Sequence, residues 1–276
     1  MLAPIAALIL AIISIQTGAS FAKNLFPIAG AAGTTTLRLF FASLILWAIW
    51  RPWRFTFKRS DLKNLCIYGM ALGSMNLAFY FSLQRIPLGL AVSLEFIGPL
   101  TLAILTSRKK IDFFWATLAG LGIFMVMPKT ELTHAINPVG ILFALIAGMF
   151  WAFYILFGQK AGKDLHSGIA ATMGMTFAAL VVLPFGLMID GPKLLNVSIL
   201  PMGLFVAILS SAIPYSLEMY SLKKIPTKTF GILMSLEPAI ASLVGLICLG
   251  EQLTVIQWFA IFCVMAASLG STLMRD

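Results

Sequence analysis

Ten long apolar runs, separated by short polar gaps, dominate this sequence. They cover residues 2–22, 34–50, 64–83, 88–107, 113–127, 138–157, 167–189, 199–222, 229–250 and 254–273. Most are close to the roughly 20 residues that a helix needs to cross a bilayer. Since a chain in hydrocarbon must satisfy its own backbone hydrogen bonds, helices are the expected spanning elements. The runs therefore predict an all-α, polytopic membrane protein with ten transmembrane helices.

Composition agrees with this class. Hydrophobic residues make up 60% of the chain and charged residues only 11%, against about 25% charged residues in soluble domains. The first basic residue, Lys23, follows the first apolar run, so we interpret this run as a retained span rather than a cleavable signal peptide. The longest gap, 51–63, is too short to separate domains.

The net charge of +9 would suggest a nucleic-acid partner on a soluble protein. Here the basic residues lie in the gaps and indicate topology instead, so no nucleic-acid partner is expected. If the N-terminus is cytoplasmic, the cytoplasmic gaps hold Arg51, Arg54, Lys58, Arg59, Lys63, Arg108, Lys109, Lys110, Lys160, Lys163, Lys223, Lys224, Lys228 and Arg275. The other side holds Lys23, Arg85, Lys129 and Lys193. This asymmetry predicts that both termini are cytoplasmic.

An internal repeat divides the chain. Residues 82–87 recur as 221–226, a shift of 139, and the same shift places Pro99 on Pro238. Each half then contributes five helices, and an odd number inverts the second half relative to the first. We expect one repeat in 1–130 and an inverted one in 138–276. Inverted repeats are typical of secondary transporters.

Three acidic residues lie inside apolar runs: Glu95, Glu218 and Glu237. Glu95 and Glu237 are expected about 10–12 Å deep, where a charge costs about 2.5–3.5 kcal/mol even on a lenient scale. We interpret both as substrate-binding and proton-coupling residues, with a structural buried polar link as the alternative. Glu218 is a substrate-binding candidate that could instead pair with Lys223.

Other polar residues of the first two runs are substrate-binding candidates. Arg38 could bind a carboxylate, pair with a buried Glu or snorkel to the interface, and Lys23 could be an interfacial anchor. Gln16, Thr17 and Ser20 could contact a substrate hydroxyl. Prolines close to the buried carboxylates, Pro99 and Pro238, predict helix breaks that could act in gating, although each could be a simple kink. Gly69 and Gly73 form a GxxxG pattern typical of helix packing.

Several chemistries lack a motif. The three cysteines lie in apolar runs, and no Cys/His cluster indicates a metal site. No phosphate-binding GxxxxGK[ST] loop, HExxH or GxSxG pattern is present. We expect no cofactor, no metal and no enzyme activity. A small-molecule substrate and the lipid bilayer are the expected partners, and the sequence leaves the oligomeric state open.

Five segments carry a resemblance to a known family: 14–20, 87–100, 214–219, 226–239 and 249–251. They resemble the EamA-type members of the drug/metabolite transporter superfamily. The resemblance implies ten helices in two inverted repeats and amino-acid efflux across the bacterial inner membrane. The resemblance assigns no role to single residues; within 214–219 we add Pro214 as a candidate helix break in gating and Tyr215 as a substrate-binding candidate. Two positions depart from the family pattern: Ile15 replaces a common Trp, and Asp112 stands where the second half has Glu251.

These observations predict an inner-membrane secondary transporter that exports small neutral amino acids, threonine and homoserine first, by proton antiport. The carboxylate of the amino acid would bind Arg38 or Lys23, and its ammonium Glu95 or Glu237. Arg38 and Glu95 are expected to line one cavity, directly paired or bridged. An exporter of hydrophobic cations or other small metabolites remains an alternative, as does a non-transporting receptor or subunit.

Overall fold

The computed structural model describes residues 2–106, 111–126, 137–161, 165–194, 196–222, 224–225, 230 and 233–273. Within these residues the chain is helical and forms no strand. Six helical segments are long and apolar enough to cross a membrane, and four shorter apolar helices accompany them. The described part is thus a polytopic, all-α membrane protein, as the apolar runs predict.

The helices follow the predicted runs and mostly extend past them. Those that cover single runs are α1 (Leu2–Ala29), α2 (Ala31–Trp50), α3 (Arg59–Leu83), α6 (Ile111–Val126), α7 (Pro138–Ala161), α8 (Ser167–Leu194), α12 (Glu237–Leu249) and α13 (Val255–Leu273). The short helices η1 (Pro52–Arg54) and η2 (Val197–Ile199) lie in gaps. The repeat residue Pro226 and the basic residues 108–110, 129, 163, 223, 228 and 275 lie outside the described residues.

The fourth and the eighth predicted spans are interrupted helices. The fourth run forms α4 (Leu88–Glu95) and α5 (Ile97–Thr106), which meet at Phe96. The eighth forms α9 (Leu200–Ala207), the π-helical segment η3 (Ile208–Ala212) and α10 (Ile213–Leu222). A π-helical turn holds one extra residue and is often found at functional sites. Apolarity alone does not predict either interruption, because the run of hydrophobic residues continues through both.

The distribution of side chains is that of a membrane protein. Large apolar side chains cover the outside, for example Met188 and Val255, each 85% exposed. Some charged and amide side chains within the spans lie inside: Arg38 and Gln16 are each 3% exposed. An apolar surface facing lipid and a polar interior are expected where the solvent is hydrocarbon.

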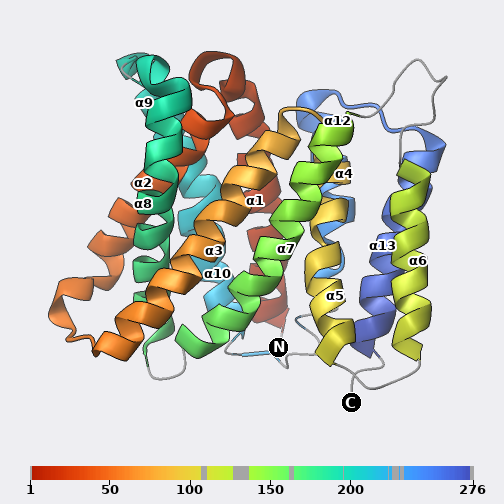
Figure 1. The fold of residues 1–276 in the computed structure, drawn as a ribbon, viewed down its shortest axis with the longest axis horizontal. Helices are drawn as coiled ribbons and strands as arrows, with labels where there is room; N and C mark the ends of the chain where they lie inside the picture. Colours follow the sequence, from red (N-terminus) through yellow and green to blue (C-terminus); the bar gives the residue numbers. More distant parts are fainter. Residues whose placement is uncertain are drawn as a thin grey trace.

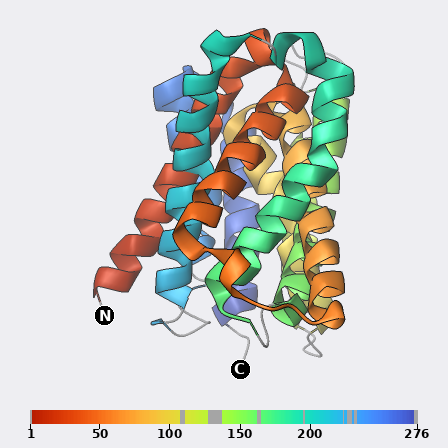
Figure 2. The ribbon, with the colours of Figure 1, turned by 90° about the vertical axis from the view of Figure 1, so that its left-hand side faces the viewer.

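The helices form one upright bundle. α1 begins and α13 ends at the same end of it (Figure 1), and the side view shows the long helices running between its two ends (Figure 2). α1 packs on α10 and α12, α3 on α7 and α8, and α2 on α8. α6 and α13 pair at one edge of the bundle (Figure 1). The central helices α1, α3, α4 and α7 therefore enclose the middle of the molecule.

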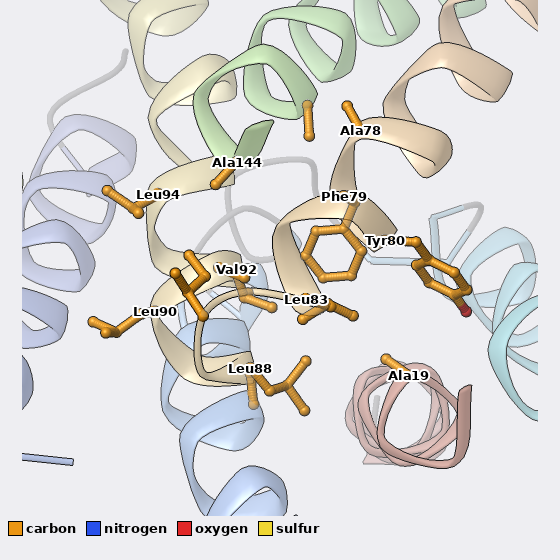
Figure 3. Close-up of a cluster of buried hydrophobic side chains, with 14 of the residues drawn as sticks. Ala19, Ala78, Phe79, Tyr80, Leu83, Leu88, Leu90, Val92, Leu94 and Ala144 are labelled. Carbon is orange, nitrogen blue, oxygen red and sulfur yellow. The ribbon is translucent and has the colours of Figure 1, made fainter. Parts of the chain in front are cut away.

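A buried apolar cluster fixes these central helices to one another. It includes Leu83 and Leu88 on either side of the turn between α3 and α4, together with Ala19 of α1 and Ala144 of α7 (Figure 3). The cluster is built mostly from leucine, alanine and aromatic side chains, which pack closely without polar atoms. One member, Tyr80, is fully buried, and its hydroxyl points away from the cluster (Figure 3).

Candidate functional site

The charged group at the centre of the candidate site is Arg38. It is 3% exposed, seven residues after the start of α2. Its Nε donates to Ser211 Oγ (3.1 Å) and its Nη2 donates to the Ser210 carbonyl (3.0 Å). Its guanidinium carbon lies 5.2 Å from the centre of the Tyr80 ring. These partners are all neutral, and no ion pair among the described residues neutralises Arg38.

Two buried carboxylates lie close to this guanidinium. Glu95, 8% exposed, ends α4 and lies within electrostatic range of both Arg38 and Glu237. Its carboxylate forms no hydrogen bond or ion pair among the described residues. Direct Arg38–Glu95 pairing, one of the two predicted arrangements, is therefore not what this structure shows. The two side chains are buried from lipid and share one polar region, as the bridged arrangement requires.

The second carboxylate, Glu237, joins α12 to α1. Its Oε1 accepts a hydrogen bond from Gln16 Nε2 at 2.9 Å, while Oε2 is buried without a partner. Leaving a polar atom of this kind unpaired in an apolar interior is costly. The predicted site residues Gln16, Arg38, Glu95 and Glu237 thus come together in the middle of the bundle, with several of their polar atoms unoccupied.

A second polar layer lies along α10. Tyr215 is within electrostatic range of Arg38, Glu95 and Glu218. Glu218 is also within electrostatic range of Glu237. The rings of Tyr68 and Tyr154 stack beside this layer, with centres 5.0 Å apart. Tyr215 and Glu218 were predicted, whereas sequence reasoning missed Tyr68 and Tyr154. Tyrosines are common in membrane helices, and their positions in the two apolar runs gave no signal.

Thr17 and Ser20 contribute less to the centre. The Ser20 hydroxyl is buried and donates to the Thr17 carbonyl at 2.7 Å within α1. Such a bond back to the same helix leaves the hydroxyl oxygen able to accept one more bond. Thr17 itself is half-buried. Both remain predicted substrate contacts on the helix that also carries Gln16.

The predicted prolines lie at or near helix ends. Pro238 is the second residue of α12, directly after Glu237. Pro99 is the third residue of α5, so the break itself falls three residues earlier, at Phe96. Pro214 is the second residue of α10, just after the π-helical segment η3. A proline near the start of a helix leaves few backbone hydrogen bonds unmade, so all three fit the positions they occupy.

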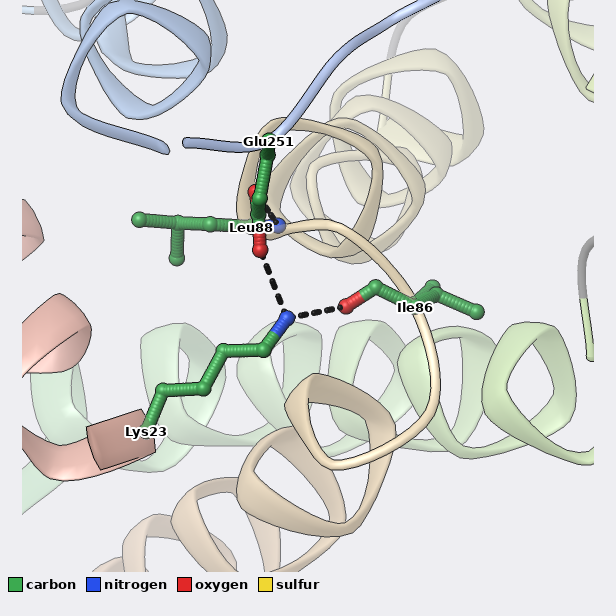
Figure 4. A network of polar contacts seen from close by, with 4 residues as sticks. All are labelled: Lys23, Ile86, Leu88 and Glu251. Atoms are coloured by element: carbon green, nitrogen blue, oxygen red, sulfur yellow. Dashed lines mark hydrogen bonds and ion pairs between the residues drawn. The ribbon is translucent and has the colours of Figure 1, made fainter. Parts of the chain in front are cut away.

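Lys23 lies apart from Arg38, at the end of the bundle opposite the start of α1. Its Nζ binds Glu251 Oε1 at 2.6 Å and donates to the Ile86 carbonyl at 3.0 Å (Figure 4). The other oxygen of Glu251 accepts the backbone N–H of Leu88 at 2.8 Å. This ion pair joins α1 to the turn before α4 and to the segment after α12. In this structure Lys23 thus has a partner other than a substrate. Glu251 is a functional candidate that sequence reasoning used only for comparing the two halves and for the family resemblance.

A bundle with an apolar exterior and a buried, partly unpaired set of opposite charges defines a multi-span membrane transporter. Comparison with known proteins agrees. Residues 138–273 match the EamA-like transporter family. The threonine/homoserine exporters RhtA of Escherichia coli (strain K12) and Salmonella typhimurium (strain LT2) are each 49% identical over 270 residues, which cover 98% of this chain and 91% of the relative.

More distant similarities agree in class. An uncharacterized transporter of Archaeoglobus fulgidus is 26% identical, covering 91% of this chain and 90% of the relative. One protein crystal structure, 15% identical, superposes with a TM-score of 0.58 over 98% of this chain and 97% of its own; this likeness concerns the fold alone. The chain belongs to the EamA-like transporter family.

Proposed function

We propose that this protein exports small neutral amino acids, threonine and homoserine first, across a bacterial inner membrane, with both termini cytoplasmic. Two relatives carry the name threonine/homoserine exporter. Each is 49% identical to this protein over 270 residues, which cover 98% of this chain. The excess of Lys and Arg in alternate gaps supports the orientation. Leu2 of α1 and Leu273 of α13 lie at one end of the bundle, which is compatible with both termini on one side (Figure 1).

The observation that carries this proposal is the charge arrangement in the centre. Arg38 is a buried cation without a carboxylate bonded to it, and Glu95 and Glu237 are buried carboxylates with unoccupied oxygens. Buried charges without partners are strongly unfavourable. A zwitterionic amino acid offers a carboxylate to Arg38 and an ammonium to Glu95 or Glu237, and so matches the site in charge.

The site is closed in this structure. Arg38, Glu95 and Glu237 each have less than a tenth of their surface exposed. Helices must therefore move before a substrate enters or leaves, as transport by alternating access requires. We infer that the structure represents an occluded arrangement of the transporter.

Two inverted repeats, 1–130 and 138–276, would supply this movement, and the helix packing supports them. A two-fold axis would exchange each of the first five spans with the corresponding one of the last five, so each contact should have a counterpart. The contact of α3 with α7 has its counterpart in the contact of α10 with α1, and the contact of α3 with α8 has its counterpart in that of α9 with α2. The α2–α8, α4–α12 and α6–α13 contacts map onto themselves. A pattern of this kind is expected of two halves related by a two-fold axis.

Proton antiport is the coupling that we propose. Burial favours the neutral form of a carboxyl group, so Glu95 and Glu237 are suited to carry a proton when no ammonium is bound. Proton and substrate ammonium would then compete for the same oxygen atoms. This competition links the inward movement of one to the outward movement of the other.

Purified protein in proteoliposomes tests the function. Vesicles loaded with labelled threonine or homoserine should release it faster when a proton gradient is imposed, and vesicles with Arg38→Gln should lose this release. Arg38→Lys, which keeps the charge but not the planar group, should retain part of it. An exporter of hydrophobic cations needs the carboxylates but not Arg38, so cation efflux that survives Arg38→Gln would replace our proposal with that alternative.

A further inference from the structure

The π-helical segment η3 is held by side chains from two other helices. The Leu209 carbonyl accepts the Ser14 hydroxyl of α1 at 2.6 Å. The next carbonyl, of Ser210, accepts Arg38 of α2, and so does the hydroxyl of Ser211. A π-helical turn departs from the regular i→i+4 ladder, which leaves its carbonyls available to side chains. Arg38 is therefore bound to the backbone of the eighth span.

These bonds use only part of the hydrogen-bonding capacity of Arg38. A guanidinium has five N–H donors in a planar fork, and the structure shows bonds from Nε and Nη2 alone. The remaining donors are buried with the side chain. A planar fork with free, buried donors is well suited to a carboxylate, which it can bind through two parallel hydrogen bonds.

The ring beneath Arg38 carries an unpartnered polar group, the hydroxyl of Tyr80. Tyr80 is fully buried, its ring lies under the guanidinium of Arg38, and its hydroxyl has no hydrogen-bond partner. Its ring packs at 5.5 Å from that of Phe26, so the apolar part of the side chain is satisfied. A buried hydroxyl without a partner destabilises a fold, because it loses its hydrogen bonds to water and gains none in return. Phenylalanine would fill the same space without this cost. The hydroxyl is therefore better explained by a bound ligand that accepts its hydrogen bond.

We propose that Tyr80 is a substrate-binding residue, and that its hydroxyl and the free N–H groups of Arg38 together bind the carboxylate of the transported amino acid. The proposal rests on the amino-acid export proposed above and assigns the anionic end of the same site. The carboxylate accepts from both groups, and its negative charge neutralises the buried guanidinium. The ammonium end is left to face Glu95 and Glu237.

Binding in this place has a consequence for η3. The neutral acceptors of η3 hold Arg38 less strongly than a carboxylate does, so a carboxylate bound at the free N–H groups draws the guanidinium toward itself and weakens its bonds to Ser210 and Ser211. A ligand shifts a conformational equilibrium only through a difference in its interactions with the two states. The exchange of Arg38 from η3 to substrate supplies this difference, because it loosens α2 from the eighth span.

Equilibrium binding of labelled threonine to purified protein in nanodiscs tests the subsite, with threoninol as a competitor that lacks the carboxylate. Tyr80→Phe should weaken threonine binding about ten-fold, the loss expected for one hydrogen bond to a charged group, and change threoninol binding less than about two-fold. Its thermal stability without ligand should be equal to or above that of the wild type. The matched control is Tyr220→Phe, at an exposed tyrosine on α10. This variant should change the binding of neither threonine nor threoninol.

Ser211→Ala tests the exchange in the opposite direction. It removes one resting partner of Arg38, so threonine should bind a few-fold more tightly while the rate of transport falls. The subsite would be overturned if Tyr80→Phe weakened the binding of threonine and threoninol equally, or left the selectivity between them unchanged. A lower melting temperature of Tyr80→Phe would also overturn it. Weaker threonine binding in Ser211→Ala would overturn the exchange. A wild-type protein that binds no threonine would instead refute the proposed export function itself.

Discussion

At the scale of single residues, Glu95 is the group whose replacement best separates binding from proton coupling. It ends α4, is 8% exposed, and makes no hydrogen bond among the described residues. Glu95→Gln keeps the size and polarity of the side chain but cannot exchange a proton. We expect the variant to lose net efflux driven by a pH gradient while keeping threonine exchange between the two sides of the vesicle.

The measurement compares counterflow with net efflux in the same proteoliposomes. Asp61→Asn serves as the control, because Asp61 lies in the first turn of α3 and its side-chain hydrogen bonds to described residues are with its neighbours Lys58 and Ser60. Uphill efflux that persists in the wild type after the proton gradient is collapsed would contradict antiport. Glu95 would then serve binding or structure alone.

Sequence reasoning found the charged residues of the site and some neutral ones, such as Gln16 and Tyr215, but missed other neutral neighbours. Arg38, Glu95 and Glu237 stand out because a charge inside an apolar run is costly and therefore needs a reason. Tyr80 carries no such signal because tyrosines are common in membrane helices, and Ser210 and Ser211 carry none because serine hydroxyls on helices commonly bond to their own backbone. From the sequence we predicted that Arg38 and Glu95 attract each other, but not that they lack a direct bond, because the acceptors that the π-helical turn offers to Arg38 were not foreseen.

At the scale of helices, the break after Glu95 is set by a contact between two glycines. A Cβ atom on Gly98 of α5 would collide with the backbone of Gly148 in α7, and one on Gly148 would lie 2.5 Å from the Glu95 carbonyl oxygen. Only glycine allows the two helices to approach so closely. The sequence predicted a break near Pro99, but it could not place it at Phe96, because the partner glycine is on another helix.

Gly148→Ala should therefore displace the junction of α4 and α5. Forcing an extra methyl group into a packed interior typically costs about 1–3 kcal/mol, so we expect a lower melting temperature in detergent and weaker transport, since Glu95 ends α4. The matched control is Gly120→Ala in α6, where an added Cβ meets no atom within 4 Å. A Gly148→Ala protein as stable and active as this control would show that the close approach is dispensable.

At the scale of the whole molecule, the ten apolar runs were sufficient to predict the class of protein and most helix positions. The arrangement of the helices is less accessible to sequence, because every helix is apolar on its lipid face and amphipathic periodicity is weak. Internal similarity filled part of this gap by predicting two related halves. Which helix contacts which across the halves depends on close packing of small residues, such as Gly73 of α3 against Ala178 of α8, and the sequence pattern showed only that Gly73 packs somewhere.

The ion pair of Lys23 with Glu251 joins the two proposed halves at one end of the bundle, so it should control the opening of that end. Lys23 lies on α1 and Glu251 follows α12, and the pair also binds the Ile86 carbonyl and the Leu88 N–H (Figure 4). Opening by alternating access would separate α1 from the turn before α4 and from the segment after α12. We therefore expect Lys23→Gln and Glu251→Gln each to favour the state open at this end.

A cysteine placed at Ala19, which is 4% exposed, reports this opening in a protein whose natural cysteines have been replaced. Its reaction with an impermeant maleimide added on the Lys23 side should be several-fold faster in either single variant. The double variant should be no faster than the singles, because both substitutions remove one and the same interaction. Lys193→Gln is the control, since it removes an ion pair within α8 while the other oxygen of Asp190 keeps its hydrogen bond from the Gly33 N–H of α2. Additive effects of Lys23→Gln and Glu251→Gln, or an equal effect of Lys193→Gln, would mean that loss of charge rather than loss of this link changes the rate.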